Sequence, residues 1–298
     1  MTPQQQFDID FTKPIKSWAG HLDKAQAAAL ALLINPRKVK AKRLPCPDDI
    51  HFGCTFPFTV GSLTVLQDIA GRHHPQVLDA ACGYGYFSYL AAIAGGNVMG
   101  IDINKKAVDE ANDEFKQYIT GAVKFAHADI FKWSGEYDVI HCRKFMHFLP
   151  PSMQVELLQL LYSMLRPGGV MYISANSIHS GDAKRRAFVE RRFNAGELNP
   201  GYVTFSRTNH AIECRAVPHG KEIKPGILST AQDGKSQIYM TNMLDHKTFA
   251  MHVEEAEIPA QQVEIYYESW NIYVPEIISD PEQIKPDTPY NLFVKIKG

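Results

Sequence analysis

Residues 77–88 of this chain read VLDAACGYGYFS, and they determine which fold we expect. The run begins as a buried strand, passes through two glycines and continues into a segment that predicts a helix. Gly83 and Gly85 lie where the backbone bends tightly and where a ligand can approach without meeting a Cβ atom. Turns of this kind between a strand and a helix bind cofactors that contain adenosine. We therefore expect a nucleotide-like ligand at this turn.

The third glycine of the dinucleotide pattern GxGxxG is missing, because position 88 is a serine. In dinucleotide-binding proteins that glycine lets helix and strand pack closely beside a pyrophosphate. Asp102 follows the next predicted strand, 97–101, at a position where an acidic side chain accepts hydrogen bonds from ribose hydroxyls. The alternative is an ordinary βαβ turn with a surface aspartate. The combination favours a ligand that has a ribose but no pyrophosphate.

Five blocks of sequence follow one another in a characteristic order. They are DAACGYG at 79–85, IDI at 101–103, HADI at 127–130, YDVIH at 137–141 and LRPGG at 165–169. Together they resemble the motifs of the class I S-adenosylmethionine-dependent methyltransferases of small molecules. Ala81 departs from the family, which often has glycine there. The resemblance covers residues 77–174 well, the later strands loosely and the first fifty or so residues hardly at all.

The resemblance implies S-adenosylmethionine as the cofactor. Asp102 would bind the ribose and Asp129 the adenine amino group, while Ile103 and Ile130 would enclose the adenine ring. Asp79 would order the turn or reach the cofactor's amino group through water. The complete set of cofactor-binding residues that we expect is Asp79, Ala81, Gly83, Gly85, Asp102, Ile103, Asp129, Ile130 and Cys142.

The same resemblance, together with the strand and helix patterns, predicts an α/β fold. We expect a Rossmann-like, seven-stranded, mostly parallel sheet with helices on both faces and an antiparallel last strand. The core would comprise residues 55–176 and 243–298. An N-terminal helical cap would occupy 1–54, and an α+β insertion after the fifth strand, 177–242, would recognise the substrate. The expected helices of the core and the insertion are 59–70, 86–94, 104–117, 151–165 and 182–194.

Composition limits the classes of partner. The chain has 298 residues, 45% of them hydrophobic, which is enough for one enlarged domain. A formal net charge of -1 gives no overall field that would attract nucleic acid or an acidic membrane. No apolar run is long enough to span a bilayer, and no signal peptide is evident. The five scattered cysteines fit a reduced cytoplasm and show no metal-ligand spacing, so we assign no metal.

The loop after the fourth strand is where we expect the chemistry. His147 is the candidate proton acceptor for methyl transfer to an oxygen, nitrogen or carbon nucleophile, although it could instead be a packing residue. Arg143 could hold an anionic group of the substrate or form an interface ion pair. The loop lacks the Asn-Pro-Pro-Tyr motif of enzymes that methylate amino groups of DNA bases or glutamine. We therefore expect a small-molecule substrate.

Other functions stay open. A basic run at 37–43 and the arginine-rich sequence 184–192 would suit an RNA or protein methyltransferase, or simply a solvated surface. A non-catalytic cofactor-binding or assembly protein would use the insertion as an interface. An NAD dehydrogenase fits less well, because of the serine at position 88 and the block around Asp129. We also leave open a homodimer.

Overall fold

We obtained a computed structural model of the chain. It describes residues 59–115, 122–180, 183–207, 212–218, 220–221, 223, 227–230, 237–269, 276–285 and 288–298. The expected N-terminal cap, 1–54, and the basic run at 37–43 lie outside the described residues.

A mixed sheet of eight strands forms the centre of the molecule, in the order β11-β10-β12-β5-β4-β1-β2-β3. Its strands are β1 (Gln76–Ala80), β2 (Asn97–Asp102), β3 (Val123–His127), β4 (Tyr137–Arg143), β5 (Leu165–Asn176), β10 (Val263–Ser269), β11 (Ile277–Ile278) and β12 (Tyr290–Lys297). Strands β1 to β5 are parallel, whereas β12 runs antiparallel to both of its neighbours, β5 and β10. The arrangement is Rossmann-like, and its last strand is antiparallel as predicted.

The sheet has eight strands where seven were predicted. The extra strand, β11, has two residues, which pair antiparallel with Tyr267 and Glu268 of β10. A two-residue strand is too short to produce an alternating pattern in the sequence, so the prediction missed it. The block LRPGG at 165–169 lies within β5, which begins at Leu165.

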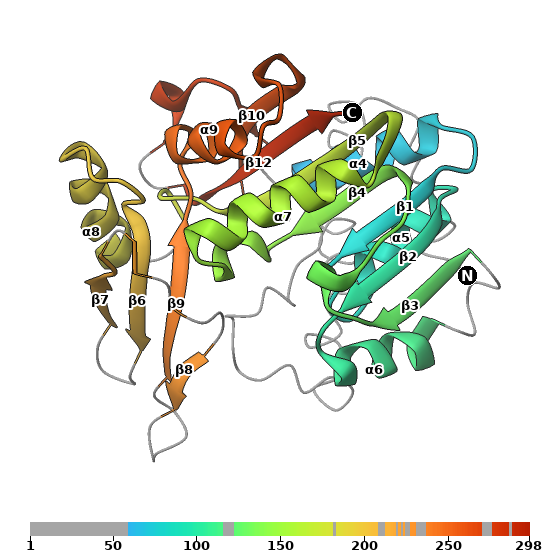
Figure 1. The fold of residues 1–298 in the computed structure, drawn as a ribbon, viewed down its shortest axis with the longest axis horizontal. Coiled ribbons are helices and arrows are strands. Elements are labelled where there is room, and N and C mark those ends of the chain that lie inside the picture. The colour runs from blue at the N-terminus through green and yellow to red at the C-terminus, as the bar shows by residue number, and fades with distance from the viewer. Residues whose placement is uncertain are drawn as a thin grey trace.

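Helices cover both faces of the sheet. They are α4 (Val60–Gly71), α5 (Tyr86–Ile93), α6 (Lys105–Phe115), α7 (Pro151–Ser163) and α9 (His246–Glu255). In β1, Val77 packs in one core cluster with residues of α4 and α5, while its neighbour Leu78 packs in another with residues of α7 and α9. The side chains of successive strand residues thus pack on opposite faces of the sheet, as expected for a sheet covered on both faces. Figure 1 shows α7 crossing the near face.

Local sequence explains where these helices begin. The Thr59 side chain accepts a hydrogen bond from the Ser62 amide at the start of α4, and Asp245 does the same for two amides of α9. Pro151 occupies the first turn of α7, where no intrahelical donor is needed. Each of these residues satisfies or avoids a backbone group that the helix start would otherwise leave unpaired.

Between β5 and α9 the chain forms a second, antiparallel sheet. Its order is β7 (Ile212–Ala216), β6 (Gly201–Arg207), β9 (Gln237–Met243) and β8 (Ile227–Thr230), with α8 (Ala183–Asn194) packed nearby through Val189. Figure 1 shows this sheet at the left of the molecule, beside the end of α7. Strand β9 contacts the short 3-10 helix η4 (Met146–Phe148), which follows β4. The second sheet therefore touches the loop in which we expect the chemistry.

Among the described residues, no helix combines the length and apolar character that a membrane crossing needs.

Candidate functional site

A cavity of about 520 Å³ lies at the carboxyl ends of β1, β2 and β4. In an open α/β sheet this edge is the usual place for a ligand. Seven of the predicted cofactor residues and one of the two predicted catalytic residues line it: Asp79, Ala81, Gly83, Asp102, Ile103, Asp129, Ile130 and Arg143. The other predicted residues, Gly85, Cys142 and His147, are not part of its lining.

The two glycines of the first turn have different roles. Both have left-handed backbone angles, with φ of 54° at Gly83 and 73° at Gly85. A Cβ atom at Gly83 would meet nothing within 4 Å, whereas one at Gly85 would collide with the Phe125 ring. Gly83 therefore leaves room beside the cavity, while Gly85 permits the packing between α5 and β3. Ala81 also has a positive φ, 59°, so this turn holds an alanine in a backbone region that favours glycine.

Asp102 is bound into the same turn. Its Oδ2 accepts a hydrogen bond of 2.8 Å from the Gly83 amide, and its Oδ1 accepts one of 2.8 Å from the Asn104 amide. Burial raises the pKa of the Asp102 carboxyl, and these two bonds oppose that rise. Each carboxylate oxygen can accept a further bond, so the group fits two neighbouring ribose hydroxyls. The structure thus supplies an anchored acceptor at the position where the sequence predicted one.

The residues expected around the adenine ring border the same cavity. Ile103 is 68% exposed, unusual for a large apolar side chain beside a cavity, and a flat apolar ligand would cover it. Ile130 is buried and also lines the cavity. Asp129 begins the 3-10 helix η3 (Ile130–Lys132), where its Oδ1 accepts a bond of 3.1 Å from the Phe131 amide. These residues fit an adenine ring with its amino group near Asp129.

A buried network connects β1, α5 and β4 beneath the cavity. Asp79 Oδ1 lies 2.9 Å from His141 Nδ1, and Asp79 Oδ2 accepts a 2.5 Å bond from Ser88 Oγ. The His141 ring stacks on Phe87 with 3.6 Å between centroids. The serine that replaces the third glycine of the dinucleotide pattern is thus used to hold Asp79. Both oxygens of Asp79 are engaged within the protein, which favours its expected role of ordering the turn.

Comparison with known proteins agrees with this geometry. Residues 77–169 match the family described as a methyltransferase domain. Two solved structures share the fold at TM-scores just above 0.5. They are an S-adenosylmethionine-dependent methyltransferase of Clostridium acetobutylicum (TM-score 0.51, 12% identity, 88% of this chain and 98% of that chain) and the CcbJ methyltransferase of Streptomyces caelestis (0.52, 13%, 89% and 97%).

Residues 77–169 thus carry a methyltransferase domain, and the wider chain shares the fold of the two solved methyltransferases. A curated relative, the ubiquinone biosynthesis O-methyltransferase of Shewanella pealeana, is 32% identical over 114 residues, which are 36% of this chain and 46% of the relative. The corresponding protein of Aromatoleum aromaticum is 31% identical over 113 residues, 35% of this chain and 45% of the relative. The chain spans about half the length of the curated relatives it matches.

His147 does not line the cavity. The side chain is 2% exposed, and its Nδ1 accepts a long hydrogen bond of 3.4 Å from the Asn176 amide. Burial, followed by the charges of Lys144 and Arg185, holds the pKa of His147 well below its usual value. The geometry does not support His147 as the proton acceptor, because it places the imidazole in the packing between η4 and β5. His141 is the histidine that lines the cavity.

His141 is the last residue of the block YDVIH at 137–141, but the sequence analysis assigned the proton transfer to His147. The signal was present, because His141 lies near the end of the fourth strand, in register with Asp79 on the neighbouring first strand. Residues in register on adjacent parallel strands point to the same face of the sheet. Cys142, the next residue, points the other way into the core, where burial raises the pKa of its thiol to about 12. Its expected contact with the cofactor is not supported by this orientation.

The expected insertion affects the cavity indirectly. Among the described residues, none from 177–242 lines it. Instead, Asn242 of β9 donates a 3.0 Å bond to Gln154 Oε1, and Gln154 donates a 2.9 Å bond to the Met146 carbonyl of η4. Thr241 donates to the His147 carbonyl at 3.3 Å. The second sheet thus supports the loop that carries two cavity residues, Phe145 and Phe148.

Proposed function

We propose that this chain transfers the methyl group of S-adenosylmethionine to a small-molecule acceptor. The observation that carries the proposal is the position of Asp102, whose anchored carboxylate lies beside Gly83 in a cavity that continues past the adenosine site. The cofactor supplies a methyl group on a sulfonium, which is already activated for displacement. The protein's main contribution is then to hold the two reactants in line.

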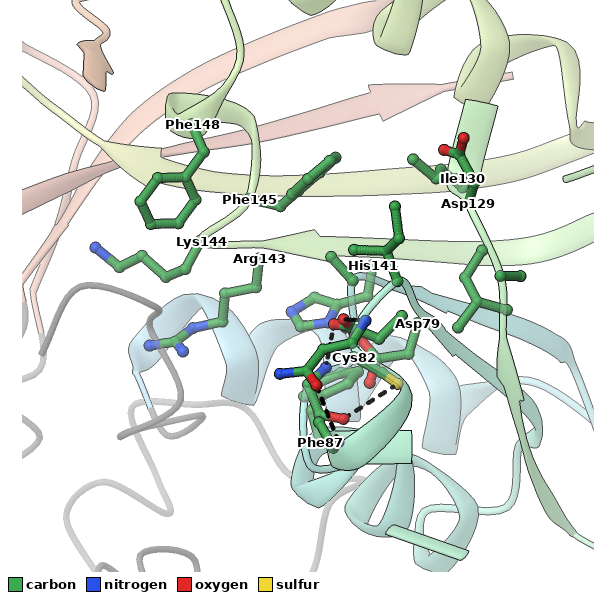
Figure 2. Close-up of a pocket in the computed structure, with 18 of the residues that line it drawn as sticks. Asp79, Cys82, Phe87, Asp129, Ile130, His141, Arg143, Lys144, Phe145 and Phe148 are labelled. Atoms are coloured by element: carbon green, nitrogen blue, oxygen red, sulfur yellow. Dashed lines mark hydrogen bonds and ion pairs between the residues drawn. The ribbon is translucent and has the colours of Figure 1, made fainter. Parts of the chain in front are cut away.

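The cavity has a cofactor end and an acceptor end. In Figure 2, Asp129 and Ile130 lie on one side, Arg143 and Phe148 on the other, and the Asp79–His141 pair lies between them. We assign adenosine to the first side and the methyl acceptor to the second. Phe145, Phe148, Leu149 and Met153 give the acceptor end an apolar lining that excludes water.

We further propose that His141, in place of His147, accepts the proton of the nucleophile. A carboxylate can only accept hydrogen bonds, so the contact with Asp79 requires Nδ1 of His141 to donate. The other ring nitrogen, Nε2, then keeps its lone pair and can take a proton. Stacking on Phe87 and the bond to Asp79 fix the ring in one orientation, as a proton acceptor requires.

The relatives support a small molecule as the acceptor. Their names place them in ubiquinone biosynthesis and describe O-methyl transfer, which makes an oxygen nucleophile the first choice for this chain. The RNA alternative is less well supported by α8. Arg192 is 8% exposed and donates to the Pro200 and Tyr202 carbonyls, and Arg186 lies 4.0 Å from Glu190. Two of the arginines that suggested RNA binding are therefore engaged within the protein.

The test is turnover. Purified full-length protein would be mixed with S-adenosylmethionine and a small-molecule cell extract, and S-adenosylhomocysteine would be measured. We expect it to form only when protein and extract are combined, and Asp102→Ala to abolish its formation. Cofactor binding without turnover on any extract would instead favour a non-catalytic binding protein. Stabilisation of the fold by NADH and not by S-adenosylhomocysteine would favour a dehydrogenase. The cytoplasmic location and the homodimer remain predictions.

A further inference from the structure

Arg143 is a partly buried cation at the acceptor end of the cavity, and its Nε meets no hydrogen-bond partner among the described residues. It ends β4 and lines the cavity, yet its Nε is buried and has no hydrogen-bond partner among the residues that the structure describes. Burial lowers the pKa of its guanidinium, which shows how poorly this position solvates a charge. A buried charge is costly unless it is paired and hydrogen-bonded. A group of opposite charge beside Arg143 would remove this cost.

The two carboxylates whose charges act on Arg143, Glu268 and Asp79, are already bound to other donors. Both oxygens of Asp79 are engaged, by His141 and by Ser88. The donors to Glu268 are the Gly61 amide at 2.8 Å, Ser174 Oγ at 2.5 Å and Asn291 Nδ2 at 3.3 Å. Neither carboxylate forms an ion pair with Arg143, so both contribute only a long-range attraction.

Lys144 adds a second cation to the same end. Its backbone is left-handed, with φ of 57°, and its amide donates a 2.6 Å bond to the Ser174 carbonyl. Nζ donates to Asn176 Oδ1 at 2.6 Å and also to Asn291 Oδ1, so neutral amide groups hold the ammonium in place. Burial and the neighbouring Arg143 keep the pKa of Lys144 well below its usual value. Two adjacent basic groups beside a cavity favour an anion, because its negative charge would stabilise the protonated forms of both.

Phe145 and Phe148 complete this end. Both line the cavity, and Figure 2 shows them next to Lys144 and Arg143, away from Asp129. An apolar surface beside a guanidinium suits a ligand that has an apolar body and a charged end. The guanidinium can give two parallel hydrogen bonds to one carboxylate or phosphate.

We propose that the acceptor is a small organic anion, whose carboxylate or phosphate is bound by Arg143 and whose apolar body rests on Phe145 and Phe148. This inference rests on the proposed methyl transfer and specifies its substrate class. The guanidinium fixes one end of the acceptor, while the rest of the molecule extends toward His141, which lies between the two ends of the cavity. Arg143 thus acts in substrate binding.

The experiment measures binding of three matched probes to the full-length protein saturated with S-adenosylhomocysteine. They are 3-phenylpropionate, 3-phenylpropionamide and 2-phenylethyl phosphate, which share an apolar body and differ in the end group. We expect calorimetry to show at least one anion binding about tenfold or more tightly than the amide. Which anion binds more tightly distinguishes carboxylate from phosphate. An amide that binds as tightly as both anions, or no binding of either anion, would overturn the proposal.

Variants assign the effect to Arg143. Arg143→Gln should remove the preference for the anion, and Arg143→Lys should keep only part of it, because a lysine lacks the paired donors. Arg166→Gln is the matched control, since Arg166 is 40% exposed and pairs with Asp138 near the start of β5. An anion preference that survives in Arg143→Gln would contradict the assignment. Circular dichroism would confirm that each variant is folded.

The two proposals can fail separately. S-adenosylhomocysteine should bind Arg143→Gln as it binds the wild type, because the cofactor end lies on the other side of the cavity. If the wild-type protein did not bind S-adenosylhomocysteine, the proposed function would be wrong. Intact cofactor binding without a preference for anions would remove only the substrate class.

Discussion

The two ends of the cavity differ in the sequence separation between the residues that hold each end in place. At the cofactor end, Asp102 is held by Gly83 and Asn104, and the supporting network joins Asp79 to Ser88 and His141. At the acceptor end, the loop after β4 is held by residues up to 147 positions away, because Lys144 is bound by Asn291. Local motifs therefore specify the first end, and tertiary packing specifies the second.

The largest effect should come from the cofactor end. Asp102→Ala removes the acceptor expected to bind two ribose hydroxyls and also leaves the Gly83 and Asn104 amides without that partner. We expect its affinity for S-adenosylhomocysteine to fall about a hundredfold or more, as measured by calorimetry. Asp109→Ala is the control, because Asp109 is exposed on α6 and pairs with Lys105. Unchanged affinity in Asp102→Ala would refute the ribose assignment.

Variants of His141, in β4, and of His147, in η4, should differ in whether they affect the reaction or the stability of the fold. His141→Gln should lower kcat about a hundredfold, since the variant keeps the buried position but cannot accept a proton in the same way. His147→Gln should mainly lower the melting temperature, because His147 packs between η4 and β5 and does not line the cavity. Steady-state kinetics and thermal unfolding of both variants provide the measurement. The reverse pattern would restore His147 as the proton acceptor.

The two glycines of the first turn should respond differently to alanine. Gly85→Ala combines a left-handed backbone with a collision against Phe125, and we expect it to cost about 2 kcal/mol of stability. Gly83→Ala adds only the backbone strain, about 1 kcal/mol, but places a methyl group beside the cavity. Urea unfolding compares their stabilities, and calorimetry compares their cofactor affinities. Equal stability losses would mean that the Phe125 ring moves aside freely.

The smallest effect should come from the support of the acceptor end. Asn242→Ala removes the bond from β9 to Gln154 and should raise the KM for the acceptor several-fold, with about 1 kcal/mol lost in stability. Affinity for S-adenosylhomocysteine should stay unchanged. Asn97→Ala is the control, because Asn97 is exposed at the start of β2. A weaker cofactor affinity in Asn242→Ala would show that the two ends are not independent.

The same difference explains what sequence reasoning could achieve. Gly83, Asp102 and Asp129 belong to short motifs, each at the end of a strand, so their meeting at one sheet edge follows from the order of the strands. The packing of the His147 side chain away from the cavity was not accessible in this way. It depends on the Asn176 amide and on β9, which reach the loop only after the second sheet has formed. That no described residue pairs with the Arg143 Nε likewise depends on which donors occupy Glu268 and Asp79.

A crystal structure with S-adenosylhomocysteine tests the central claim, that one cavity has a cofactor end and an acceptor end. We predict that the ribose hydroxyls lie within hydrogen-bond distance of Asp102 and that the adenine ring lies between Ile103 and Ile130. The sulfur should face the part of the cavity lined by His141, Arg143 and Phe145. A sulfur that faces away from these residues, or an adenosine bound elsewhere, would contradict the account.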